Sequence, residues 1–183
     1  MEERKKFSEI KWFKKNLISL ASVSFFLFGI FFVPARVDAA TMSLSPRTGS
    51  YKVGQTFSVG VYVGSSEAAM NAVSGVISFP SDLLQVISVS KSGSILNLWV
   101  QEPSFSNGSV NFEGIVYNPG FTGASGKIVS VTFKAKAEGT AVVSFSSGSV
   151  LANDGQGTNI LAGFGRANFT IGGAPVEPKP PVT

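Results

Sequence analysis

Carboxylates are the side chains of this sequence that could perform acid–base chemistry, and few of them follow residue 40. Those few are Glu67, Asp82, Glu102, Glu113, Glu138, Asp154 and Glu177. A glycosidase needs two carboxyl groups facing each other across a cleft. Only Glu102 and Glu113 could meet on neighbouring strands, and isolated carboxylates on strands are usually solvated surface groups. The acidic residues alone therefore do not predict catalysis.

Histidine and cysteine are both absent from the 183 residues. Without histidine there is no usual proton shuttle at neutral pH and the commonest metal ligand is missing. Without cysteine there is no disulfide scaffold, thiolate metal site or thiol nucleophile. Serine is abundant, but no G-x-S-x-G sequence is present to activate one. We expect a protein that is not an enzyme and that carries no cofactor.

One segment has the spacing of a calcium loop. Residues 153–159, Asn-Asp-Gly-Gln-Gly-Thr-Asn, place oxygen-bearing side chains at alternate positions. The segment lacks the second carboxylate and the closing glutamate that an EF-hand loop requires. We interpret it as a glycine-rich hairpin turn and expect no metal site.

Aromatic side chains could bind sugars by stacking on pyranose rings. The candidates are Tyr62, on the polar parity of its segment, Tyr117, in a loop sequence, and Trp99, which lies beside Leu96 and Leu98. A carbohydrate-binding module would need them in one flat row, whereas single exposed aromatics are common on any surface. A polysaccharide ligand stays open on this reasoning.

The first 39 residues differ from the rest of the chain. Lys11, Lys14 and Lys15 precede an uncharged run from Leu17 to Val33, and small residues follow near Ala39. This order is typical of a secretory signal peptide, and the run is just long enough to be an uncleaved membrane anchor instead. Both interpretations predict a secreted or cell-surface protein that contacts a membrane only through this segment.

Two further features are the sequence of the C-terminal tail and the distribution of charge along the chain. Residues 173–183 are proline-rich and predict an extended linker or tail. Most of the net charge of +4 lies in the first 39 residues. The other basic residues are scattered and form no stripe that could follow a phosphate backbone, so we expect no nucleic-acid partner.

Residues 40–172 show the period-two alternation of β-strands. About nine such segments occur, separated by turn signals such as Asn107-Gly108 and Glu138-Gly139, and no convincing helical period is found. One polar and one apolar side per segment predicts an all-β fold, a two-sheet antiparallel β-sandwich or jelly roll. The side chains expected to point inward are Phe57, Val59, Val61, Ile77, Phe79, Leu84, Val110, Phe112, Val131, Phe133, Val143 and Phe145.

A proline interrupts the most strand-like stretch, residues 73–90. Proline cannot donate a hydrogen bond to a central strand ladder. We therefore expect Phe79 to end one strand and Pro80-Ser81-Asp82 to form a tight corner. Leu84 would then begin the next strand.

The corner and three other segments carry a family resemblance. A strand that ends in an aromatic residue, followed by Pro-Ser-x-Leu and a short strand, resembles the cohesin domain. Residues 43–46 with 53–59, and residues 126–136 with 138–140, are similar to other strands and turns of that family in the same order. The resemblance spans residues 41–171.

The resemblance implies a nine-stranded jelly roll that acts as a non-catalytic receptor. Cohesins bind dockerin, a small calcium-dependent helical module, through a face formed by their third, fifth, sixth and eighth strands. By strand parity the corresponding residues here are Ser74, Val76, Ser78, Asn111, Glu113, Val142 and Ser144. A carbohydrate-binding module and a structural spacer of a surface protein remain the alternatives.

Overall fold

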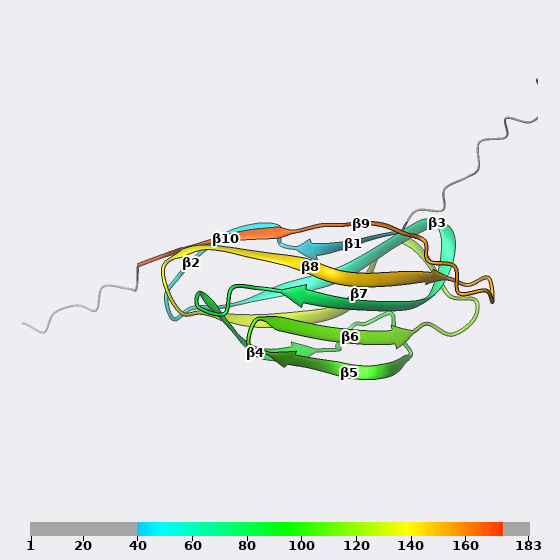
Figure 1. Ribbon diagram of the computed structural model, residues 1–183, viewed down its shortest axis with the longest axis horizontal. Coiled ribbons are helices and arrows are strands. Elements are labelled where there is room, and N and C mark those ends of the chain that lie inside the picture. Colours follow the sequence, from blue (N-terminus) through cyan, green and yellow to red (C-terminus); the bar gives the residue numbers. More distant parts are fainter. Residues whose placement is uncertain (1–39, 174–183) are drawn as a thin grey trace, which may run out of the picture. The chain divides into compact units, whose positions relative to one another are not determined.

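The structure is a computed structural model, which describes residues 40–173 (Figure 1). The described residues contain strands and no helix, so the all-β prediction is confirmed. The strands are β1 (Ala40–Ser45), β2 (Thr48–Lys52), β3 (Thr56–Ser78), β4 (Leu84–Ser90), β5 (Leu98–Ser106), β6 (Ser109–Ile115), β7 (Phe121–Ala135), β8 (Gly139–Ala152), β9 (Leu161–Phe164) and β10 (Ala167–Gly172). The described part of the chain has no helix long and apolar enough to cross a membrane. The predicted signal or anchor segment and all but the first residue of the tail lie outside the described residues.

The long strand β3 determines the topology. Its first half pairs with β1 and β7, and its second half pairs with β6 and β8. The edge strands β4 and β5 extend these two groups by pairing with β7 and β6. Where β3 changes partners, the buried Ser65 donates a hydrogen bond from its hydroxyl to the carbonyl of Ala68, at 2.7 Å.

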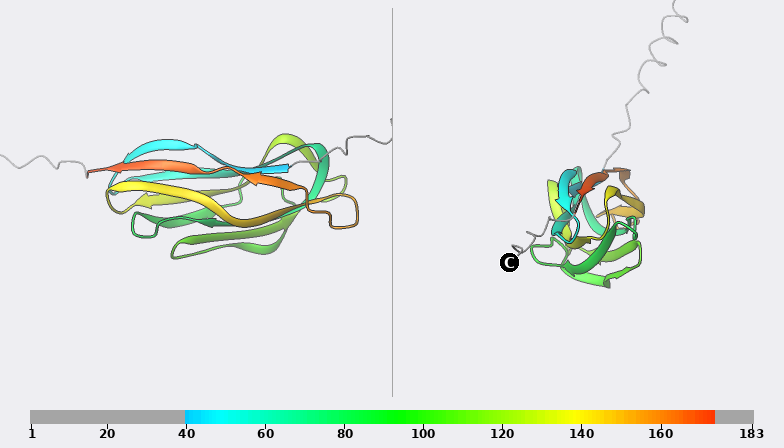
Figure 2. Two further views of the ribbon diagram at one scale, coloured as in Figure 1. Left: turned by 45° about the horizontal axis from the view of Figure 1, so that its top comes forward. Right: turned by 90° about the vertical axis from the view of Figure 1, so that its left-hand side faces the viewer.

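Hydrogen bonding joins the ten strands into one network, where the sequence predicted nine strands in two separate sheets. The reason lies chiefly in β3, which runs through both groups. Strand β8 extends the network further, because its second half pairs with β3 and its first half pairs with β10, which pairs with β2. Seen end-on, the strands surround a common interior (Figure 2).

One hydrophobic core fills that interior, and every side chain predicted to point inward is buried in it. Several aromatic rings of the core pack against one another. Phe133 is fully buried, with its ring centroid 5.2 Å from that of Phe79 and 5.8 Å from that of Phe57. Phe57 in turn stacks on Tyr51 at 3.8 Å. The alternation of apolar and polar residues along each strand thus determines which side chains pack in the core.

The corner at Pro80 has the predicted form. β3 ends at Ser78 and β4 begins at Leu84. The amides of Leu83 and Leu84 both donate to the carbonyl of Pro80, at 3.2 and 2.9 Å, which closes a single helical turn. Because the proline lies between strands, no ladder hydrogen bond is lost.

Candidate functional site

A broad outward surface is formed by β5, β6, the second half of β3 and β8, and we call it the four-strand face. Strand register arranges its side chains in four cross-strand rows. The apolar row consists of Leu98, Ile115, Ala72 and Leu151, and the carboxylate row of Gln101, Glu113, Ser74 and Ser149. The amide row consists of Ser104, Asn111, Val76 and Ser147, and the serine row of Ser106, Ser109, Ser78 and Ser144.

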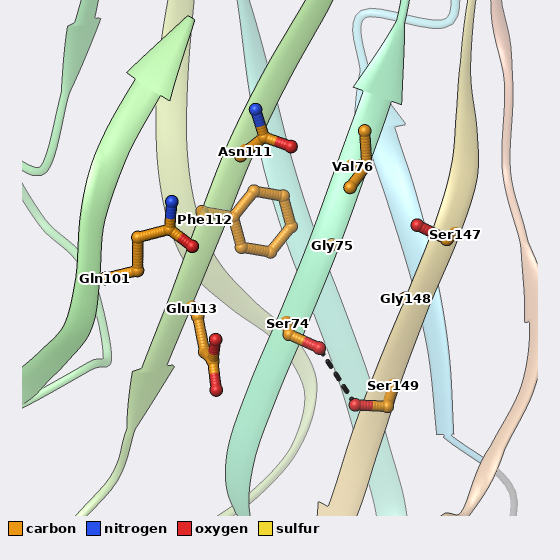
Figure 3. Close-up of a pocket in the computed structure, with 10 residues that line it drawn as sticks. All are labelled: Ser74, Gly75, Val76, Gln101, Asn111, Phe112, Glu113, Ser147, Gly148 and Ser149. Carbon is orange, nitrogen blue, oxygen red and sulfur yellow. Dashed lines mark hydrogen bonds between the residues drawn. The ribbon is translucent and has the colours of Figure 1, made fainter.

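The middle of this face is hollowed. The carboxylate and amide rows, without Ser104, line a shallow hollow of about 310 Å³ together with Gly75, Phe112 and Gly148 (Figure 3). Ser74 and Ser149 share a hydrogen bond of 2.9 Å across β3 and β8. The lining side chains are short near β3 and β8, so this part of the surface is flat and accessible.

Two facing glycines form the floor of the hollow. Gly75 on β3 lies opposite Gly148 on β8. A Cβ at Gly148 would lie 2.4 Å from Cε of Met42, which belongs to the core. The core therefore occupies the space beneath these two strands, and any larger residue would push the strands outward.

The structure brings together four of the predicted partner-binding residues. Ser74, Val76, Asn111 and Glu113 all line the hollow. Ser78 and Ser144 lie outside the hollow, opposite each other in the serine row. Val142 lies farther along β8, where it pairs with Asn168 of β10, and it is exposed.

The β8 residues of the hollow, Ser147 and Ser149, were missed by the sequence reasoning. A β-bulge in β8 explains why: Ile77 pairs with Phe145, but the preceding residue Val76 pairs with Ser147. The extra residue reverses the parity of β8, so that odd positions point inward before the bulge and outward after it. Burial along β8 shows the reversal, because buried Phe145 is at an odd position and buried Val150 is at an even one.

Sequence reasoning also missed the apolar row. Leu98 is 48% exposed, and Ala72, Ile115 and Leu151 are half-buried. Ala72 and Ile115 have the parity of the predicted residues on β3 and β6 and lie two positions along, so continuing the alternation on those strands would have found them. The four-strand face thus combines an apolar end with a polar middle.

Comparison with known proteins decides the family. A family model described as the cohesin domain matches residues 42–161. The chain belongs to the cohesin family. No curated protein matches this cohesin in sequence.

Solved structures of other cohesins are similar to it in fold. A non-cellulosomal cohesin from the archaeon Archaeoglobus fulgidus aligns with a TM-score of 0.58 and 17% identity, covering 73% of this chain and 91% of that chain. The sixth cohesin of scaffoldin B from Acetivibrio cellulolyticus, solved in complex with a mutant Cel5 dockerin, gives 0.58 and 16%, covering 73% and 99%. A cohesin from a type I cohesin–dockerin complex of Clostridium thermocellum gives 0.58 and 12%, covering 73% and 94%.

The aromatic residues considered for sugar stacking are dispersed in this cohesin. Tyr62 is half-buried in the first half of β3, opposite Ser43 of β1. Trp99 packs against the core from β5, and the ammonium of Lys91 lies 5.7 Å from its ring centroid. Tyr117 is 57% exposed in the loop after β6. The structure does not assemble the three into one row.

The two carboxylates considered for catalysis, Glu102 and Glu113, do not face each other. Gln101, and not Glu102, lies opposite Glu113. Glu102 instead forms an ion pair with Lys91, at 2.7 Å. No group of three or more acidic residues that could hold a metal ion occurs among residues 40–173.

The segment with calcium-loop spacing forms a hydrogen-bonded turn. The carboxylate of Asp154 accepts hydrogen bonds from the hydroxyl of Thr158 and, at 2.8 Å, from the amide of Gln156. These bonds favour the ionised form and lower the pKa of Asp154 below its ordinary value.

Proposed function

We propose that this cohesin is an extracellular, non-catalytic receptor module that binds a dockerin-type protein partner through its four-strand face. The observation that carries the proposal is the convergence of Ser74, Val76, Asn111 and Glu113 on one hollow. A flat surface of small side chains with a few polar and apolar groups suits the docking of a helix. Solved cohesins similar in fold are bound to dockerins, which supports the same class of partner.

The proposal includes the organisation of the whole chain. Residues 1–39 export the protein as a signal peptide or hold it as a membrane anchor, and residues 173–183 serve as a linker. Residues 40–172 are the receptor, in which the two groups of paired strands act as the two sheets of a jelly roll. We retain Ser78, Ser144 and Val142 as peripheral contacts, because they lie beyond the hollow on the same strands.

Titration calorimetry with dockerin-type segments encoded in the same genome tests this function. We expect binding that requires calcium, because dockerins are calcium-dependent modules. Asn111→Ala and Val142→Asp should weaken it, whereas Lys134→Ala, on β7 outside the four-strand face, should not. Binding to a polysaccharide in place of a dockerin, with loss on Tyr62→Ala, would establish a carbohydrate-binding module instead.

A further inference from the structure

We propose that Glu113 determines which partner the four-strand face accepts, by pairing with a lysine or arginine on a helix of the partner. An apolar side chain three or four residues away on that helix would contact the apolar row. This inference rests on the proposed function and specifies the chemistry of the partner.

Charge is the first reason to single out Glu113. It is the one charged residue in the four rows of the face. Its side chain is exposed, and within residues 40–173 it forms no ion pair. The nearest acidic neighbour along β5, Glu102, is already paired with Lys91. A partner that covers Glu113 without supplying a positive charge would bury an unpaired carboxylate, which is unfavourable.

The surroundings of Glu113 favour a basic group over a neutral one. The residues opposite it, Gln101 on β5 and Ser74 on β3, are uncharged and cannot neutralise it. The hollow of about 310 Å³ beside it provides room for a lysine or arginine side chain to approach from above (Figure 3). An anionic partner such as a nucleic acid or an acidic lipid surface would meet a like charge here.

The apolar row fixes the second contact and the spacing. Ile115 follows Glu113 by two residues on β6, which places the two rows about 7 Å apart along the strands. A helix rises about 6 Å over four residues, and residues three or four apart lie on the same side of it. A helix lying along β6 would therefore place an apolar residue on Ile115 and Leu98 while a basic residue reaches Glu113.

The test is a selection with a display library. The library carries the Cel5 dockerin of Acetivibrio cellulolyticus with its exposed helix positions randomised, and the target is the full purified protein. We expect enriched clones to combine a lysine or arginine with an apolar residue three or four positions away. Their affinity should fall roughly tenfold or more for Glu113→Lys, because like charges then meet. A parallel selection against Glu113→Lys should enrich aspartate or glutamate at the basic position.

Two controls separate this inference from the proposed function. Glu113 is exposed, so Glu113→Lys should fold normally, and its thermal unfolding is measured to verify this. Clones that lose binding to Val76→Asp but bind Glu113→Lys as well as wild type would overturn the inference and leave the proposed function standing. No enrichment, or clones insensitive to every change on the four-strand face, would overturn both. Clones that tolerate Leu98→Asp would contradict the apolar contact.

Discussion

Gly75 lies directly against the ring of Phe112: a Cβ added to the glycine would be 2.4 Å from Cζ of that ring. The aromatic ring packs beneath β3, so at Gly75 the backbone of the four-strand face contacts the core directly, with no side chain of its own between them. The hollow is therefore shallow because of how the core packs beneath it, as well as because the residues on its surface are small.

The first prediction follows from this contact. Gly75→Ala should destabilise the fold by about 1–3 kcal/mol, because Phe112 is enclosed and has little room to shift. Urea unfolding measures the effect. Gly163→Ala is the matched control, since a Cβ there would meet nothing within 4 Å. Equal stabilities of the two variants would show that the ring does not fill this space.

The core predicts a sharp contrast between two consecutive residues of β7. Phe133→Ala should cost about 3–5 kcal/mol, because it leaves a cavity between strands that other aromatic rings line. Lys134→Ala, whose side chain is exposed, should change the free energy of unfolding by less than about 0.5 kcal/mol. Similar losses in chemical denaturation would mean that the inward and outward sides of β7 have been assigned wrongly.

Asn153 is predicted to stabilise one end of the fold through its side chain. Its amide accepts from Asn71 at 3.2 Å and donates to Asn118 and to the carbonyl of Pro119 at 3.1 and 2.8 Å. Asn153→Ala should therefore lose about 1–2 kcal/mol, because one part-buried and two exposed hydrogen bonds disappear together. Asn168→Ala, an exposed amide on β10, serves as the control in thermal unfolding. A variant at position 153 as stable as this control would contradict the network.

Asp154 gives a prediction about pH. Its pKa in the folded protein lies below the ordinary 3.8, first because of the hydroxyl of Thr158 and then the amide of Gln156. The ionised carboxylate thus stabilises the fold above pH 3.8, and this contribution is lost as the pH falls through the folded-state pKa. Nuclear magnetic resonance titration should give a higher pKa for Asp154 in Thr158→Val. An unchanged pKa in that variant would rule out the hydroxyl as the cause.

Sequence alternation was sufficient to predict the core and the corner, because both depend on local rules. Each predicted inward residue, from Phe57 to Phe145, follows the period of two within its own strand. Pro80 likewise marks a corner by its chemistry alone. Such features require no knowledge of which strands are neighbours.

The strand network and half of the hollow depend instead on pairing between distant segments. The continuity of β3 through both groups of strands is set by its partners β1, β6, β7 and β8, which no local pattern names. The bulge at Phe145 likewise shows its effect only when β8 is placed against β3. The contribution of Ser147 and Ser149 to the site could therefore be recognised from the structure but was not reached from alternation.

The most direct test of the receptor account is a cysteine footprint of the complex. The chain has no cysteine, so Val76→Cys in the hollow and Lys134→Cys on β7 each introduce a single thiol. Alkylation rates are measured with and without a saturating dockerin that binds in calorimetry. The account predicts that the dockerin strongly slows alkylation at position 76 and leaves position 134 unchanged. Unchanged alkylation at position 76 under saturation would contradict binding through the four-strand face.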